Sequence, residues 1–254
     1  MSVQLIDMVF PGDANHHGNL FGGAAMAHMD KVAFLAATRH ARRTFVTAAC
    51  DRLDFTAPAL LGEMVEATGR VVRVGRSSLT VEVQLQAEAL LSGERRLCTR
   101  GQFHMVAIDR GPDRPSLPPL PAQGDPAPAP DDAWLTTVEI VLPSRTSHYG
   151  GLFGGDALDM MGKAAFIAAS RRARAVMVMA ASRQIDFTAP IKVGEMVELR
   201  SRIAATGRTS LNVEVELWGE DLLSGARTRS TVGEFVMVAV DADGRPTPIG
   251  AGAG

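Results

Sequence analysis

Asn15, the pair Gly22-Gly23 and Asp30 have types and a spacing that could act on a carbonyl group. Asn15 lies in a polar loop, the two glycines open a predicted helix, and Asp30 follows two helical turns later. Glycines at a helix start allow close backbone approach, and their N–H groups lie at the positive end of the helix dipole. This arrangement can stabilise the charge that develops on a carbonyl oxygen, as an oxyanion hole does. The alternative interpretation is a tight turn packed against a sheet.

Asp30 is the most unusual residue of this set. Its helical neighbours three and four residues away are Met26, Ala27, Ala33 and Phe34, so its carboxylate is expected to project into apolar surroundings. A buried carboxylate is costly unless it is paired. A functional interpretation makes Asp30 a general base or a nucleophile. The alternatives are a structural salt bridge and a polar position at an interface.

The elements around these residues change from helix to strand along the chain. The pattern predicts a strand from Gln4 to Val9, a helix from Ala24 to Arg42, and strands from Phe45 to Phe55, Met64 to Val74, Ser78 to Ala89 and Arg96 to Ile108. The helix is apolar on almost every side, which is typical of a buried helix. Leu79 to Leu85 alternates strictly, as a half-exposed antiparallel strand does. The order predicts an α+β hotdog fold, in which a curled sheet wraps a central helix.

This pattern occurs twice. Leu20 to Gly23 returns as Leu152 to Gly155, and Asp54 to Pro58 as Asp186 to Pro190, at a constant offset of 132 residues. Solenoid repeats run at roughly 20–50 residues, so this period indicates a duplicated domain. We expect hotdog domains at 1–109 and 134–244, fused into a double hotdog. A proline-rich linker is expected at 110–133 and a flexible tail at 245–254.

Composition excludes several classes of partner. The formal net charge is −2, whereas nucleic-acid binding requires a basic face. No apolar run approaches the roughly 20 residues that span a bilayer, so no membrane insertion is expected. Cys50 and Cys98 are the two cysteines, too few for a disulfide framework or a zinc site. These features favour a cytoplasmic protein without a metal.

Larger motifs make the chain recognisable. The segment Asp13 to Gly23, with Asp30 seven residues beyond it, resembles the acyl-CoA thioesterases of the hotdog superfamily, and Val74 to Ser78 and Met105 to Asp109 also fit. The resemblance covers both copies. It implies hydrolysis of an acyl-CoA to a free acid and CoA with no cofactor, CoA being part of the substrate. It further implies that a helix-start glycine amide polarises the thioester carbonyl, the helix Asp activates water or attacks directly, and the loop Asn orients water or substrate.

The resemblance also implies that each site lies at a junction of two hotdogs, with Asn and glycines from one and Asp from the other. Copy two has Ser147 in place of Asn15 and Gly162 in place of Asp30. Two combinations of residues follow: Asn15 and Gly23 with Gly162, which lacks a carboxylate, and Ser147 and Gly155 with Asp30. We therefore expect one working site per chain, built on Asp30, Ser147 and Gly155.

Two acidic residues occur only in copy two. Asp156 and Asp159 stand where copy one has Ala24 and Ala27. Asp156 complements the dipole of its helix. Asp159 lies one turn before Gly162 and could replace the missing acid.

The resemblance suggests positions for the CoA moiety and a mode of assembly. Arg76 with Ser77, and Arg208 with Thr209, follow a turn glycine, and an Arg beside a hydroxyl can hold a phosphate. A solvated turn is the alternative. The expected assembly is a homo-oligomer, a trimer of double hotdogs. Two other functions remain open: a hotdog hydroxyacyl-thioester dehydratase, and a non-catalytic acyl-CoA-binding module.

Overall fold

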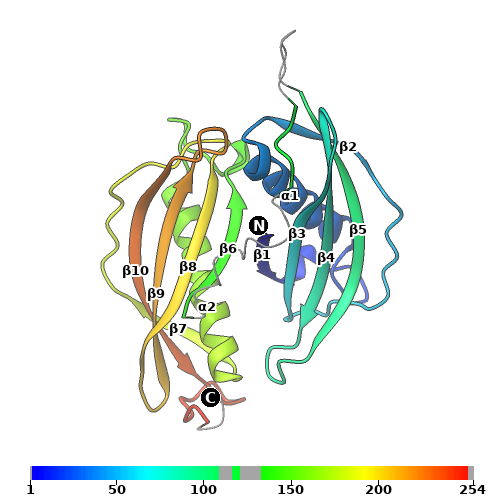
Figure 1. Ribbon diagram of the computed structural model, residues 1–254. Helices are drawn as coiled ribbons and strands as arrows, with labels where there is room; N and C mark the ends of the chain where they lie inside the picture. The colour runs from blue at the N-terminus through cyan, green and yellow to red at the C-terminus, as the bar shows by residue number, and fades with distance from the viewer. Residues whose placement is uncertain (1, 109–115, 121–132, 251–254) are drawn as a thin grey trace. The chain divides into compact units, whose positions relative to one another are not determined.

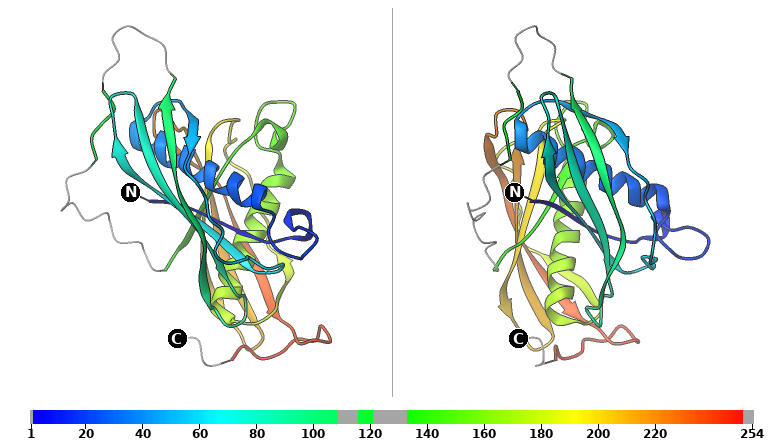
Figure 2. Two further views of the ribbon diagram at one scale, coloured as in Figure 1. Left: turned by 90° about the vertical axis from the view of Figure 1, so that its right-hand side faces the viewer. Right: turned by 45° about the vertical axis from the view of Figure 1, so that its right-hand side comes forward.

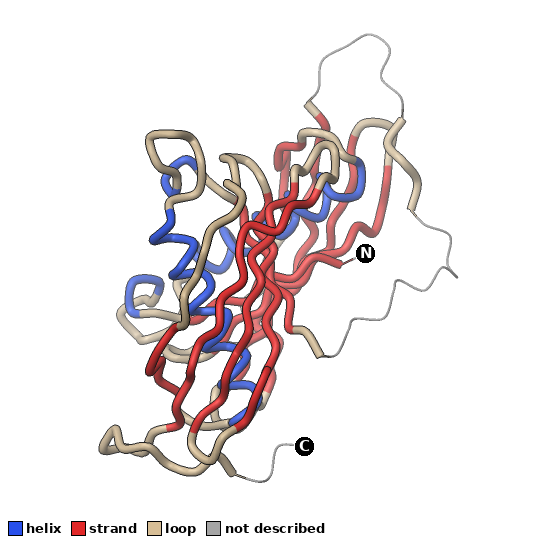
Figure 3. Tube along the Cα trace, turned by 90° about the vertical axis from the view of Figure 1, so that its left-hand side faces the viewer, coloured by secondary structure: helices blue, strands red, loops and turns tan. Residues whose placement is uncertain are grey.

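The computed structural model of the chain describes residues 2–108, 116–120 and 133–250. Within these ranges the chain forms two compact units (Figure 1). Each unit is a five-stranded antiparallel sheet with one long helix on one of its faces, and the tube trace of Figure 3 shows each helix beside the strands of its own sheet. The predicted α+β class with two tandem hotdogs is confirmed. Residues 110–115 and 121–132 of the predicted linker, and 251–254 of the predicted tail, lie outside the described residues.

The N-terminal unit contains five strands, a short 3-10 turn and one helix. Its elements are β1 (Ser2–Met8), η1 (Pro11–Asp13), α1 (Gly22–Ala41), β2 (Phe45–Cys50), β3 (Met64–Val74), β4 (Ser78–Glu88) and β5 (Arg95–Ala107). The strands lie in the order β1-β3-β4-β5-β2. All neighbours are antiparallel. Helix α1 contacts every strand of this sheet, and two further views show the helix lying against the strands (Figure 2).

Helix α1 buries one face rather than all of them. Met29, Val32, Ala33 and Leu35 are buried against the sheet, whereas Met26 keeps 44% of its surface exposed. The expectation of a helix buried on every side is therefore wrong in part, because one sheet covers only the stripe that faces it. In the first half of α1, residues on the side away from the sheet, such as Met26, are therefore exposed.

The second strand is shorter than the sequence predicted. Strand β2 ends at Cys50, and residues 51–55 form an irregular segment that runs on to Pro58. Leu53 from this segment lies over β5 at Gly101, where an added Cβ would lie only 2.0 Å from Leu53 Cδ2. A residue with a side chain at position 101 would require the Leu53 side chain to move. Residues 51–55 do not continue strand β2, because they cross over β5 instead.

The C-terminal unit repeats this architecture. Its elements are β6 (Leu135–Ile140), η2 (Pro143–Arg145), α2 (Gly154–Ala173), β7 (Met177–Ser182), β8 (Met196–Thr206), β9 (Ser210–Glu220) and β10 (Arg227–Ala239). The strand order is β6-β8-β9-β10-β7, the equivalent of the first sheet. Both ends of α2 lie 132 residues after those of α1. The internal repeat in the sequence therefore corresponds to a repeat of structure.

Each unit is closed by a segment that follows its last long strand. Leu117, in the expected linker, is buried and donates its N–H to the Arg76 carbonyl at 3.1 Å. Ile249, in the expected tail and 132 residues further on, donates its N–H to the Arg208 carbonyl at 2.9 Å. These contacts extend the repeat beyond the predicted domain ends. No helix in the described ranges is long and apolar enough to cross a membrane.

Candidate active site

The loop that carries Asn15 has a backbone conformation that both units share. Asn15 N–H bonds to the Asn19 carbonyl at 2.7 Å, and Ser147 N–H bonds to the Gly151 carbonyl at 2.8 Å. Gly18 turns the first loop with a φ of +73°, a conformation that favours glycine. Asn15 Oδ1 also accepts the Asn19 N–H at 3.2 Å. Because the loop of the second unit forms without this side-chain bond, Asn15 is not required for the loop conformation.

The start of helix α1 presents backbone N–H groups. Its N-cap residue is Phe21, whose ring has no oxygen that could cap the first turn. A Cβ on Gly23 would lie 2.6 Å from the Phe21 ring, so a side chain there would require this exposed ring to move. A Cβ on Gly22 would make only ordinary contact with Phe55, at 3.9 Å, so packing does not demand the first glycine. The predicted helix-start glycines are in place, and the helix begins two residues earlier than expected.

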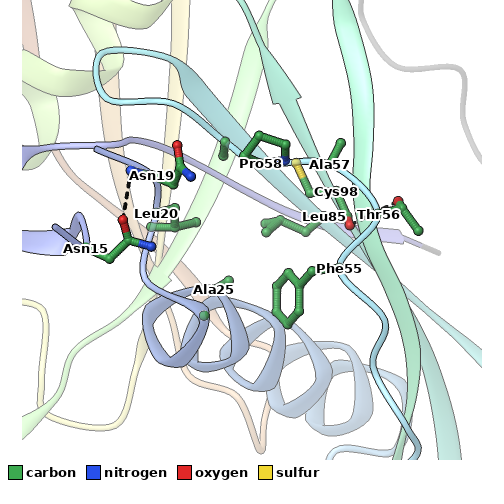
Figure 4. A pocket seen from close by; sticks show the side chains of 12 residues that line it. Asn15, Asn19, Leu20, Ala25, Phe55, Thr56, Ala57, Pro58, Leu85 and Cys98 are labelled. Carbon is green, nitrogen blue, oxygen red and sulfur yellow. Dashed lines mark hydrogen bonds between the residues drawn. The ribbon is translucent and has the colours of Figure 1, made fainter. Parts of the chain in front are cut away.

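A pocket of about 340 Å³ opens at this helix start. Asn15, Gly22 and Phe55 are among the residues that line it, and Asn15 and Phe55 lie on opposite sides above the first turn of α1 (Figure 4). Most of the remaining lining is apolar, with Leu20 and Leu85 among it. Ligand sites commonly have this size and composition, with a few polar groups that fix orientation.

Cys98 reaches the pocket through an irregularity of the sheet. The register of β4 and β5 shifts here, so that Leu85 pairs with Thr99 and Gln86 with Leu97, which leaves Cys98 as the extra residue. Such a bulge re-aims a side chain. The Cys98 carbonyl also accepts the Thr56 N–H at 2.8 Å, which ties the pocket wall to the sheet. Burial raises the pKa of the Cys98 thiol, against the opposing effect of Arg96.

The pocket wall is fastened by a partly buried ion pair. Arg96 forms a two-pronged pair with Glu63, with 2.9 Å between Arg96 Nη1 and Glu63 Oε1. Arg96 Nε also donates to the Pro58 carbonyl at 2.9 Å, and Glu63 Oε2 accepts the Leu60 N–H at 2.7 Å. The loop that carries Phe55 and Pro58 is thereby fixed to β5 and to the start of β3.

Asp30 lies in a different place from the pocket and has a partner that the sequence analysis missed. Thr47 Oγ1 donates to Asp30 Oδ1 at 2.5 Å. The carboxylate is only partly buried, which corrects the expectation of wholly apolar surroundings. Asp30 is not among the described residues that line the pocket of its own unit. Eight residues separate it from Gly22, about 12 Å along the helix at 1.5 Å per residue.

The C-terminal unit has an equivalent pocket of about 400 Å³. Each of its ten lining residues lies 132 positions after a residue that lines the first pocket. Eight of these ten positions carry the same residue type, and the exceptions are Ile191 for Ala59 and Ser230 for Cys98. The same bulge recurs, with Ser230 as its extra residue. Here Ser230 Oγ donates to the Ala189 carbonyl at 2.6 Å and so fastens the pocket wall.

The acid and its hydroxyl partner are both replaced in the C-terminal unit. Gly162 stands at the position of Asp30, and Met179 at the position of Thr47. A Cβ on Gly162 would lie 3.0 Å from Met179 Cε. The methionine methyl group therefore fills the space beside the missing carboxylate. This paired difference between the copies is a sequence signal that could have identified Thr47.

Two acidic residues of α2 lie near this position in the chain. Asp156 is in the first turn of the helix, where a negative charge complements the dipole. Asp159 is exposed and lies 3.6 Å from Lys163 Nζ, an ordinary pair between residues four apart on a helix. Neither lines the pocket of its own unit within the described chain.

The residues predicted to hold CoA lie at the turns before β4 and β9. Arg76 and Ser77 are exposed, and Arg208 is exposed beside a partly buried Thr209. Their carbonyls hold the turns through backbone bonds, and among the described residues none of the four lines either pocket. Their role toward phosphate stays a prediction. In the described ranges no group of three or more His, Cys, Asp or Glu side chains could hold a metal ion.

Comparison with known proteins agrees with this fold, which is that of a tandem hotdog protein of the thioesterase type. The chain matches the thioesterase superfamily over residues 17–92 and 149–226 and belongs to it. It resembles the crystal structure of an acyl-CoA hydrolase from Agrobacterium tumefaciens, with 48% identity, a TM-score of 0.88 and 98% of each chain covered.

Two relatives compared by sequence differ in how much of the chain they match. An uncharacterized acyl-CoA thioester hydrolase of Bacillus subtilis is 37% identical over 134 residues, 53% of this chain and 71% of the relative. The human cytosolic acyl coenzyme A thioester hydrolase is 23% identical over 283 residues, 94% of this chain and 74% of the relative. The second match therefore extends over both hotdog units.

Proposed function

We propose that this protein is an acyl-CoA thioesterase, which hydrolyses an acyl-CoA to a carboxylic acid and CoA. The observation that carries the proposal is the likeness to the Agrobacterium acyl-CoA hydrolase over both hotdog units, at 48% identity. The uncapped helix starts, the pockets beside them and the carboxylate–hydroxyl pair of Asp30 and Thr47 supply the groups that this reaction requires.

The chemistry requires a proton acceptor and a site for negative charge. The Asp30 carboxylate accepts a proton from water while the water oxygen attacks the thioester carbon. Backbone N–H groups at a helix start stabilise the resulting oxyanion. Collapse of this intermediate breaks the carbon–sulfur bond, and the CoA thiolate takes up the proton. Thr47 holds the carboxylate in position through its 2.5 Å hydrogen bond.

The catalytic set that we propose combines Asp30 with Ser147 and the helix-start glycines Gly154 and Gly155. Asp30 lies about 12 Å along the helix from the first glycine of its own unit, and the family resemblance assigns acid and glycines to different hotdogs. Ser147→Ala should then lower kcat about tenfold, since one hydrogen bond is lost. Asn15→Ala should lower kcat less than Ser147→Ala. The opposite order would assign the reaction to the loop of the N-terminal unit.

Hydrolysis can be separated from the two alternative functions by one assay. Release of free thiol from acyl-CoA substrates, from short to long chains, reports hydrolysis directly. A dehydratase would instead change a hydroxyacyl chain without freeing thiol, and a binding module would do neither. We expect thiol release at a rate that depends on chain length.

We further propose that the enzyme works in the cytoplasm, without a cofactor, as a trimer of double hotdogs. Support comes from the cytosolic human relative and from the family resemblance. Light scattering should give a mass three times the 26.9 kDa of the chain. A mass of one chain would contradict the trimer but leave the proposed reaction intact.

A further inference from the structure

The pocket of the C-terminal unit has an apolar lining, and its few hydroxyl groups are already bonded. Thr188 and Ser230 have the polar side chains among the described residues that line it. Thr188 Oγ1 donates to the Ser230 carbonyl at 2.9 Å, and Ser230 Oγ donates to the Ala189 carbonyl at 2.6 Å. The amide groups of the CoA arm would lose their hydrogen bonds to water here, which costs free energy. A hydrocarbon chain has no such bonds to lose.

This pocket connects an exposed helix start with buried side chains. Gly154, which belongs to the proposed catalytic set, lines the pocket and is exposed. Ile191 and Leu217 line the same pocket and are both buried. An acyl group whose carbonyl oxygen lies at the Gly154 N–H therefore has an apolar space into which its chain can extend, toward Ile191 and Leu217.

Ile191 lies against a glycine of strand β9. The N-terminal unit has Ala59 and Ala87 at the positions equivalent to Ile191 and Gly219. A Cβ on Gly219 would lie 3.2 Å from Ile191 Cγ1, and 3.3 Å from Ile191 Cγ2 and from Glu195 Oε2, which is closer than ordinary contact. The absence of this methyl group gives the larger Ile191 side chain room against β9. In agreement, the pocket volume of about 400 Å³ is no smaller than the 340 Å³ of the N-terminal pocket.

We propose that the pocket of the C-terminal unit holds the acyl chain of the substrate, and that Ile191 and Gly219 together set its depth. At roughly 30 Å³ for a group of the size of a water molecule, a pocket of about 400 Å³ has room for at most about 13 such groups. The substrate class is therefore acyl-CoA of medium chain length, about eight to twelve carbons. This inference rests on the proposed function, and it adds the chain and the residues that select its length.

Substitutions at the two positions should move the preferred chain length in opposite directions. Gly219→Ala pushes Ile191 toward the pocket, so kcat/KM should fall about fourfold for each methylene that no longer fits. The optimum then moves to shorter chains. Ile191→Ala opens the buried end of the pocket and should move the optimum to longer chains. Thiol release from a series of acyl-CoA substrates of increasing chain length measures both shifts.

The internal repeat supplies matched controls. The double variant Ile191→Ala/Gly219→Ala copies the pair that the N-terminal unit carries, so it is compatible with this fold, and it should also favour longer chains. The reverse exchange, Ala59→Ile/Ala87→Gly, copies the pair of the C-terminal unit into the N-terminal pocket. It should leave the preferred chain length where it is in the parent protein. A shift with this exchange, and none with the other, would overturn the inference.

The failure of this inference and the failure of the proposed function give different results. A parent protein that releases thiol, with the same chain-length profile in every variant, would overturn the inference and leave hydrolysis intact. A parent protein that releases no thiol from any acyl-CoA would instead contradict the proposed function. Calorimetry with S-alkyl-CoA thioethers then tests the pocket without turnover. Affinity should rise about fourfold per methylene up to a limit that is shorter in Gly219→Ala, and affinity independent of chain length would overturn the inference.

Discussion

At the scale of the residue, the carboxylate that we propose as the proton acceptor contacts a neighbour that is distant in sequence. Asp30 and Thr47 are 17 residues apart, and their side chains meet because β2 places Thr47 beside the helix. A hydrogen bond to a charged group contributes about 1.5–3 kcal/mol. We propose that loss of this hydrogen bond lets the Asp30 carboxylate turn away from the position in which it would activate water.

Removing the Thr47 hydroxyl should therefore lower kcat. We expect Thr47→Val to reduce kcat about tenfold, and Thr47→Ser to keep most of the activity because it restores the donor. Thr80→Val serves as the control, since Thr80 is also a strand threonine but is buried and its hydroxyl contacts His104 instead of Asp30. Steady-state kinetics would check this, and equal activity of the Val and Ser variants would contradict the positioning role.

The two cysteines should differ in reactivity. Burial raises the pKa of the Cys98 thiol, so this group stays protonated at neutral pH, and only the thiolate is nucleophilic. Cys50 is exposed. Brief treatment with iodoacetamide at pH 7.5 should modify Cys50 first, with mass spectrometry as the readout. Equal labelling of both residues would show that the pocket wall opens readily.

At the scale of the element, a loop and a β-bulge shape the pocket. The wall after β2 leaves the sheet, crosses Gly101, and is fastened at Cys98 and Arg96. Alternating hydrophobicity predicted the strands but not this exit, because residues 51–55 continue a pattern that also suits a strand. The β-bulge at Cys98 could not be predicted either, because it depends on how β4 and β5 align rather than on either strand alone.

Loss of the fastening ion pair should destabilise the N-terminal unit. We expect Arg96→Met to lower the free energy of unfolding by about 3 kcal/mol, because Glu63 stays buried without its main partner. Arg52→Met, in an exposed pair with Asp54, should change it by no more than about 0.5 kcal/mol. Urea denaturation compares the two. Similar values would mean that Glu63 finds another partner.

At the scale of the whole molecule, the duplication conserves the fold and the pockets but not the acid. The repeat at an offset of 132 predicted both units, both helix starts and the difference between Asp30 and Gly162 directly from the sequence. Thr47 was not predicted as a site residue, although the different residue at the equivalent position, Met179, was a signal for it. The pockets could not be predicted, because their linings come from the helix start, the loop after β2 and two strands.

A second acid should be restorable. Gly162→Asp together with Met179→Thr should raise kcat per chain toward about twice the parent value, with each pocket then served by a carboxylate. Gly162→Asp alone should gain less, since Met179 Cε would crowd the new side chain and provides no hydroxyl. Steady-state assays of the single and double variants would measure this. A double variant that folds but gains no activity would contradict the equivalence of the two positions.

We propose that Asp30 is the acid that drives thioester hydrolysis. The direct measurement is kcat for thiol release from acyl-CoA by Asp30→Asn, a change that keeps the size of the side chain and removes its charge. We predict that kcat falls by at least about 100-fold, as expected for removal of a general base. Turnover near that of the parent protein would contradict it.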